Sequence, residues 1–458
     1  MKKKIVAVLM AAAMVCTMAG CGGNTAPADG DKTKTDSATT DTETKTDAGS
    51  ADTTDSGSSD EDAPAVEVTQ ASNDAIQNLI NATEGTVTLT VWASELQQEF
   101  TQGLIDKFEA EYPDVDFNIT LGACSEAQAK DTVLTDIEAA ADVYTFADDQ
   151  INELVAAGAL QEVSASYTYD VTGENMAGAV DAASIDGKLY AYPMTASNGY
   201  FMFYSKEFFD ESQVGDLDTM MSIAAENGKK VSMEVSGGWY LYSFFKGAGY
   251  EVGLNDDGTN YCTWNEAGAT DVAQAILDVC ANPGFQVATD AEFQTGIAEG
   301  TIVAGVSGTW DAEAAAAAWG DNYAAAKLPT YTVAGSQVQM SSFSGYKLIG
   351  VNPHSQYVGW SMLLAEYLTN EASQVARFEA TSEGPANKAA ASAEEVKANP
   401  AISALAAQAE FATPQRVGGN YWSPSETLGT ILAGGNADGT DLQTLLDNAV
   451  EGITAPLE

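Results

Sequence analysis

The chain has 458 residues, which is too many for one hydrophobic core and predicts two domains with additional segments. Its 19 basic and 66 acidic residues give a formal net charge of −47, which argues against a nucleic-acid partner because phosphate groups would be repelled. Hydrophobic residues make up 45% of the chain, enough for sizeable cores, so we assign the acidity to a solvated surface.

The N-terminus has the features of a bacterial export signal. Lysines at residues 2–4 precede an apolar run at residues 5–15, which is too short to span a bilayer as a helix. The sequence Met-Ala-Gly-Cys at residues 18–21 resembles a bacterial lipobox, with Met in place of the usual Leu. We therefore predict a lipoprotein signal peptide at residues 1–20 and lipidation of Cys21. A plain secretory signal is the alternative.

Residues 21–71 are dominated by Thr, Asp, Ser, Gly and Ala, with few apolar side chains. Such a segment cannot bury a core, so we predict a disordered tether that holds the folded part away from a membrane surface. Residues 72–84 are expected to form a connector with a short helix, whose apolar face carries Ile76, Leu79 and Ile80.

Strand and helix patterns alternate from residue 85 onward. Residues 86–92 and 116–121 alternate like strands, and the apolar residues of 96–112 have helical spacing. This alternation indicates the α/β class with a central sheet. Further helices are expected at residues 127–141, 217–227, 237–249, 270–280, 360–368 and 442–450, and a further strand at residues 230–235.

The stretch at residues 186–209 has a different organisation. Two apolar, aromatic-rich runs at residues 188–192 and 200–204 are of strand length, and the segment between them runs from Pro193 to Gly199. Pro193 has no amide proton to donate, so the sequence predicts strand, break and strand. Such a link can carry the chain between two domains and leave Ser197 and Asn198 where the domains meet.

Several segments resemble, in this order, the extracytoplasmic solute-binding proteins of the maltose-binding type. They are TLTVW (88–92), LIDKFEAEYPDVDFNIT (104–120), ADVYTFADDQINELVAAGALQEV (141–163), DGKLYAYP (186–193), FMFYSK (201–206), SGTW (307–310) and NYWSP (420–424). The resemblance implies a two-lobe periplasmic-binding-protein fold, type II-like, with a hinge and discontinuous lobes. Lobe 1 would comprise residues 85–194 plus 340–385, and lobe 2 residues 199–338 plus 390–458. Ala141 stands where the family usually has Pro.

The resemblance also implies a carbohydrate site. Aromatic rings stack on the apolar faces of a sugar, and planar polar side chains bind its hydroxyl groups. The positions that match the family's ligand contacts are Glu95, Phe146, Asp149, Asn198 (or Ser197), Trp239 (or Tyr240), Trp310, Tyr421 and Trp422. The family's acid in the crossover link is missing here. Without the resemblance, aromatic residues at the ends of strands and helices are more often core residues than ligand contacts.

Other reactive residues are few. Cys124, Cys262 and Cys280 show no metal-binding spacing and are interpreted as buried thiols, with a Cys262–Cys280 disulfide as the alternative. His354 is the only histidine, so a histidine-rich metal site or a Ser-His-Asp triad is not expected. The pairs Asp148-Asp149 and Asp256-Asp257 lack EF-hand spacing and are interpreted as loop residues. We expect no metal and no cofactor.

The resemblance implies a lipid-anchored, monomeric binding protein on the outer face of the cell membrane. It would deliver an oligosaccharide, with a malto-oligosaccharide favoured, to the permease of an ABC importer. Two alternatives remain open. One is a secreted glycoside hydrolase, which would need two carboxyl groups beside the scissile bond. The other is a ligand receptor for a sensor kinase.

Overall fold

The computed structural model describes residues 66, 68–72, 74–255 and 258–456. The predicted signal peptide, Cys21, most of the predicted tether and the pair Asp256-Asp257 lie outside these residues. The end of the tether prediction is wrong, because Thr69–Gln70 forms strand β1, which pairs in parallel with β5 (Ala165–Ser166).

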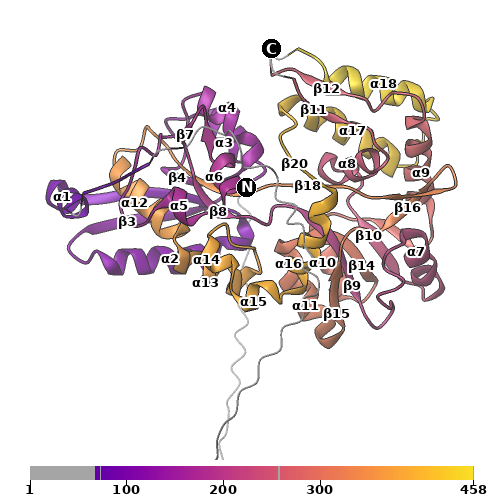
Figure 1. The fold of residues 1–458 in the computed structure, drawn as a ribbon, viewed down its shortest axis with the longest axis horizontal. Coiled ribbons are helices and arrows are strands. Elements are labelled where there is room, and N and C mark those ends of the chain that lie inside the picture. Colours follow the sequence, from indigo (N-terminus) through magenta and orange to yellow (C-terminus); the bar gives the residue numbers. More distant parts are fainter. Residues whose placement is uncertain (1–65, 67, 73, 256–257, 457–458) are drawn as a thin grey trace, which may run out of the picture. The chain divides into compact units, whose positions relative to one another are not determined.

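The first five-stranded sheet has the strand order β3-β2-β4-β19-β8. Its strands are β2 (Thr86–Ala93), β3 (Asp116–Ala123), β4 (Val143–Ala147), β8 (Tyr192–Thr195) and β19 (Lys347–Val351). The strands β3, β2 and β4 run in parallel, whereas β19 is antiparallel to both β4 and β8. Helices α2 (Gln98–Glu111) and α12 (Val358–Thr369) pack on this sheet and on each other (Figure 1).

Two local predictions for this region were wrong. Strand β8 includes Pro193, which was expected to break the strand, because β8 is the edge strand and needs no amide proton on its free side. The helix expected at residues 127–141 is only α3 (Ala129–Thr135). Beyond it the Asp136 side chain accepts a hydrogen bond from the Ala139 amide, which forms a turn in place of helix.

The second five-stranded sheet has the order β13-β10-β14-β9-β15. Its strands are β9 (Tyr200–Ser205), β10 (Lys230–Met233), β13 (Phe285–Val287), β14 (Ile302–Gly308) and β15 (Tyr323–Ala326). Strands β13, β10 and β14 pair in parallel, and β9 is antiparallel to β14 and β15. The associated helices are α7 (Leu217–Glu226), α8 (Gly238–Gly247), α9 (Ala269–Ala281), α10 (Asp290–Ala298), α11 (Ala312–Trp319), α16 (Pro400–Gln408), α17 (Trp422–Ala433) and α18 (Leu442–Ile453).

Three links connect the two sheets, and they are hydrogen-bonded to one another. The first link joins β8 to β9, the second joins β18 (Ser342–Ser344) to β19, and the third follows α13 (Glu371–Thr381). The Ala196 amide donates to the Gly384 carbonyl over 2.8 Å, and the Asn198 amide donates to the Gly345 carbonyl over 3.2 Å. The Ser197 hydroxyl accepts from the Gly384 amide over 2.7 Å. The predicted crossover segment therefore lies at the centre of this junction.

The remaining elements are short. They are α1 (Ala75–Ala82), α4 (Ile151–Ala156), α5 (Val171–Glu174), α6 (Ala177–Ala182), α14 (Lys388–Ala391), α15 (Glu394–Lys397), β6 (Ser184–Ile185), β7 (Lys188–Leu189), β11 (Val252–Leu254), β12 (Asn260–Cys262), β16 (Thr330–Val333), β17 (Ser336–Gln339) and β20 (Ala412–Pro414), with 3₁₀ turns η1 (Glu95–Gln97), η2 (Asp148–Gln150), η3 (Thr309–Asp311), η4 (Gly320–Asn322), η5 (Ala409–Phe411) and η6 (Gly419–Tyr421). In the part of the chain that the structure describes, no helix has the length and apolar character needed to cross a membrane. Cys124, Cys262 and Cys280 are free, as predicted, so the alternative disulfide is wrong, but all three are half-buried rather than buried.

Candidate functional site

A cluster of stacked aromatic rings lies where α8, β18 and α17 meet. The Trp239 ring stacks on Phe343 with 5.2 Å between centroids and on Trp422 with 6.3 Å. Both tryptophans are half-buried, whereas Phe343 is fully buried. The two predicted stacking residues Trp239 and Trp422 are thus brought together, and neither is fully buried.

Trp310, the third predicted tryptophan, lies in η3 directly after strand β14 and is also half-buried. Its indole Nε1 donates a hydrogen bond to Asp290 Oδ2 over 2.9 Å. On the ring, Lys347 Nζ lies 5.6 Å from the centroid, within the range of a cation–π contact. The ring is therefore held at its edge by an aspartate and contacted by a cation.

Three predicted aromatic contacts are core residues. Phe146 is fully buried in β4 and packs against Tyr144, so its ring has no surface for a ligand. Tyr421 is also fully buried, and its hydroxyl donates to the Gly238 carbonyl over 2.7 Å. Tyr240 is 3% exposed and donates its hydroxyl to Asp290 Oδ1. The apolar faces of these rings pack the interior, which corrects their assignment as stacking residues.

Two predicted polar contacts, Asp149 and Asn198, are joined through a residue that the sequence did not single out. Gln415 Nε2 donates to Asp148 Oδ1 over 2.8 Å and to Asp149 Oδ1 over 3.0 Å, while Gln415 Oε1 accepts from Asn198 Nδ2 over 3.3 Å. Burial raises the pKa of Asp148 to about 6, and burial together with the negative charge of Asp148 raises the pKa of Asp149 well above its ordinary value. The remaining candidate, Glu95, is exposed in η1.

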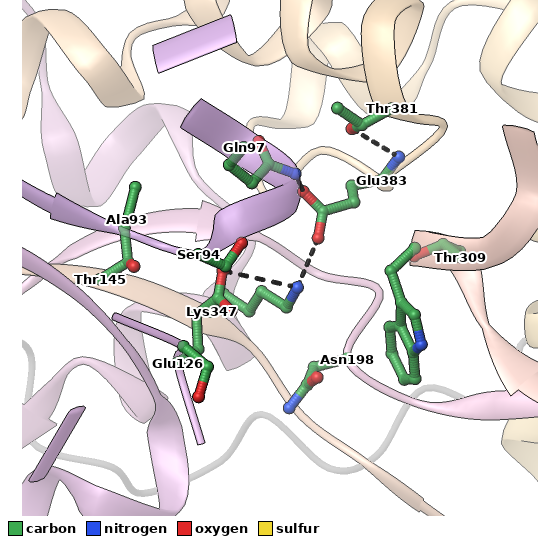
Figure 2. Close-up of polar contacts among 12 residues, drawn as sticks. Ala93, Ser94, Gln97, Glu126, Thr145, Asn198, Thr309, Lys347, Thr381 and Glu383 are labelled. Atoms are coloured by element: carbon green, nitrogen blue, oxygen red, sulfur yellow. Dashed lines mark hydrogen bonds and ion pairs between the residues drawn. The ribbon is translucent and has the colours of Figure 1, made fainter. Parts of the chain in front are cut away.

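A buried charge cluster adjoins the links between the sheets (Figure 2). Lys347 Nζ lies 2.5 Å from Glu383 Oε1 and 3.7 Å from Glu126 Oε1. Gln97 Nε2 donates to Glu383 Oε2 over 2.7 Å, and Arg377 donates to Gln97 Oε1 over 2.6 Å. All five residues are at least 92% buried. Two cations therefore balance two carboxylates inside the protein.

In this cluster the opposite charges favour the ionised forms of both Lys347 and Glu383. Burial by itself lowers the pKa of Lys347, but the charges of Glu126 and Glu383 outweigh it and raise the pKa above its usual value. Burial would raise the pKa of Glu383, yet Lys347 and Arg377 lower it overall. Among the described residues, Glu126 Oε1 is buried and has no hydrogen-bond donor. In the sequence, the feature that could have indicated this cluster is Lys347, which begins the otherwise apolar run at residues 347–351.

The described part of the chain contains no cluster of three His, Cys, Asp or Glu side chains arranged to hold a metal ion. What the geometry offers is instead a set of half-buried indole rings beside buried carboxylate, amide and ammonium groups. Ring faces and planar polar groups of this kind suit a ligand with alternating apolar faces and hydroxyl groups.

Comparisons with known proteins agree with this chemistry. A family model described as bacterial extracellular solute-binding protein matches residues 103–404. The galactooligosaccharide-binding protein of Bacillus subtilis (strain 168) is 26% identical over 338 residues, covering 68% of this chain and 75% of that protein. The maltodextrin-binding protein MdxE of the same organism is 26% identical over 354 residues, covering 73% of this chain and 81% of that protein.

A solved structure described as a complex with acarbose is 30% identical to this chain. It covers 80% of this chain and 99% of its own, with a TM-score of 0.69. The two five-stranded sheets therefore belong to the two-lobe α/β fold that the sequence predicted.

Proposed function

The chain belongs to the family of bacterial extracellular solute-binding proteins, and from that premise we propose that it captures a malto-oligosaccharide for an ABC importer. It is a binding protein rather than an enzyme, in agreement with the family and with both curated relatives. The observation that carries the choice of a sugar is the set of half-buried rings of Trp239, Trp310 and Trp422.

The lobes of this proposal follow the sequence boundaries, except that residues 340–344 join lobe 2, because Met340 and Phe343 pack in the core of the second sheet. Residues 85–194 plus 345–385 form lobe 1, residues 199–344 plus 390–458 form lobe 2, and the hydrogen-bonded links around Ala196, Gly345 and Gly384 act as the hinge. Rotation about this hinge brings Trp310 and Trp422 of lobe 2 toward the polar groups Asp149 and Glu95 of lobe 1, which closes the protein around its ligand. Asn198, on the first link, would contact the ligand from the hinge.

The choice of an α-linked glucose chain rests on similarity. One relative is named a maltodextrin-binding protein, and the 30% identical structure is described as a complex with acarbose. The other relative is named a galactooligosaccharide-binding protein, so a galactooligosaccharide is the second candidate.

The proposal also includes delivery of the bound sugar to the permease. A lipid on Cys21 would anchor the monomeric protein to the outer face of the cell membrane, the segment after it would act as a tether, and the closed, liganded form would dock on the permease. Firm anchoring requires more than one acyl chain, which lipoprotein modification of Cys21 would supply.

A thermal-shift screen against neutral oligosaccharides tests this function. A ligand that binds only the folded state stabilises it by about 2.7 kcal/mol at 100 times its Kd, so maltotriose should raise the Tm and cellotriose should not. A rise with galactooligosaccharides alone would replace the sugar but keep the class. No rise with any oligosaccharide would contradict the proposal, and cleavage of the sugar would favour the hydrolase alternative.

A further inference from the structure

Two aspartates and one serine are hydrogen-bonded in series behind Trp310. Asp290, the first residue of α10, accepts hydrogen bonds from Trp310 Nε1 over 2.9 Å, Tyr240 Oη over 3.1 Å and Ser307 Oγ over 3.2 Å. Asp311, the last residue of η3, lies 2.7 Å from Ser307 Oγ through its Oδ2. Its Oδ1 accepts from Gln294 Nε2, also over 2.7 Å. Ser307 thus lies between two carboxyl groups.

The number of protons in this series is restricted. A serine hydroxyl has one proton and can donate it to only one of the two carboxyl groups. If both aspartates were ionised, one carboxylate oxygen would face the lone pairs of Ser307 Oγ. If Asp311 is protonated, it donates to Ser307, and Ser307 donates to Asp290. Every group then has a partner. Ser307 and Asp311 are both fully buried, so water does not replace a missing donor.

The proton belongs on Asp311 rather than Asp290. Asp290 has three donors and lies in the first turn of α10, where the helix dipole favours a negative charge. A capping box between Thr289 and Glu292 fixes this turn. Burial and the charge of Asp290 raise the pKa of Asp311 to about 6. Burial raises the pKa of Asp290 overall, although its hydrogen bonds and Lys347 partly offset this rise.

We propose that Asp290, Ser307 and Asp311 form a proton-sharing chain that positions the Trp310 ring and makes oligosaccharide binding weaken as the pH rises. These are positioning residues, and the inference rests on the proposed role of Trp310 in binding a sugar. The other titratable or charged groups that face the chain come from three elements or loops. They are Glu234 after β10, Tyr240 on α8 and Lys347 on β19, and Glu234 is itself faced by Glu292 on α10 and Glu426 on α17.

The direction of the pH effect follows from the protonation of Asp311 in the proton-sharing chain. Below about pH 6 the chain is complete and Asp290 holds the indole. Above this pH Asp311 ionises, and a second negative charge competes with Asp290 for the single Ser307 proton. The Asp290 carboxylate then loses the Ser307 donor at Oδ1 and is repelled by Asp311, which shifts the Oδ2 atom that holds the Trp310 indole. Affinity is therefore full at low pH and falls as the pH rises through the pKa of Asp311. Glu234, whose pKa burial raises to about 7, is the neighbouring group that could produce a similar profile.

The first test uses the protein without ligand, so it does not depend on the sugar. In protein labelled with ¹⁵N-tryptophan, the Trp310 indole signal, assigned with Trp310→Phe, should titrate with a midpoint near pH 6. It should titrate in the same way in Glu234→Gln and stay constant in Asp311→Asn, whose amide can donate to Ser307 at every pH. An unchanged midpoint in Asp311→Asn, or no titration between about pH 4.5 and 8 in the native protein, would overturn the proposal.

The second test measures the Kd for maltotriose at pH 5 and pH 8. We expect the native protein and Glu234→Gln to bind about fivefold or more weakly at pH 8, and Asp311→Asn to keep its low-pH affinity. Ser307→Ala, which removes the shared hydroxyl, serves as a second variant and should also lose the pH dependence. Loss of the pH dependence in Glu234→Gln alone would contradict the proposed proton-sharing chain. Absence of maltotriose binding at both pH values would instead contradict the proposed function. The indole titration, which needs no sugar, would still test the proton-sharing chain.

Discussion

Lys347 is a charged side chain in a strand whose other residues are apolar and buried. Its ammonium group lies between Glu383 and Glu126 and faces the ring of Trp310. Because taking two charges out of water has a large cost, such a pair contributes little net stability when intact but is expensive to break. The cluster therefore fixes geometry: it joins the second link, the third link and the turn η1.

Replacing Glu383 with Gln should destabilise the protein by about 3–5 kcal/mol, because Lys347 and Arg377 then keep only one carboxylate between them. The matched control is Glu162→Gln, which removes an exposed 2.8 Å pair with Lys188 and should change the stability little, because solvent screens such a pair. Urea unfolding of both variants measures the difference. Equal losses would show that the buried cluster does not behave as a charged unit.

At the level of elements, the alternation of strands and helices and the crossover at residues 186–209 could be predicted because local patterns determine them. The helices α7, α8, α9 and α18 and strand β10 form where their periodicity indicated. Gln415, Glu126 and Glu383 could not be predicted as neighbours of the site. They reach it only through long-range packing, and no local spacing marks them. Phe146 and Tyr421 failed for the converse reason, since an aromatic residue beside a site has the same local pattern whether it faces ligand or core.

The connector helix α1 provides a further test at this scale. Its residues Ile76, Leu79 and Ile80 pack against the core of the first sheet, and Thr83 Oγ1 accepts a hydrogen bond from Trp360 Nε1 over 2.8 Å. The double variant Ile76→Ser, Leu79→Ser should lower the free energy of unfolding by about 1–3 kcal/mol and leave maltotriose affinity unchanged. Gln77→Ser, on the exposed face of the helix, is the control. A loss of affinity equal to that of a site variant would contradict a purely structural role.

For the whole molecule, the net charge of −47 adds a general repulsion that opposes the ionisation of carboxyl groups. Asp148, Asp149, Glu234 and Asp311 all have pKa values raised chiefly by burial. An acid with a raised pKa binds more protons in the folded state, so its contribution to stability decreases as the pH rises from its unfolded pKa, about 4, to its folded pKa. Glu383 acts in the opposite direction, but only below about pH 4, near the ordinary pKa of a glutamate.

We therefore expect a higher Tm at pH 5.5 than at pH 7.5 for the native protein. Asp148→Asn should reduce this difference, because it removes a group whose pKa of about 6 lies in the window. Asp181→Asn, at an exposed aspartate paired with Arg416, should leave the difference unchanged. Circular dichroism melting curves at the two pH values measure all three proteins. A Tm that rises toward pH 7.5 would show that the buried acids do not control the pH dependence.

Calorimetric titration of maltotriose into the protein is the most direct test of sugar binding at the tryptophan site. We predict saturable binding of one maltotriose per chain, weakened about tenfold to hundredfold, or about 1.4–2.8 kcal/mol, by Trp310→Ala and by Trp422→Ala. The control Trp319→Ala removes a half-buried tryptophan that packs on Phe293, outside the proposed site, and should bind as the native protein does. Absence of binding to the native protein, or equal affinity in all three variants, would contradict the account.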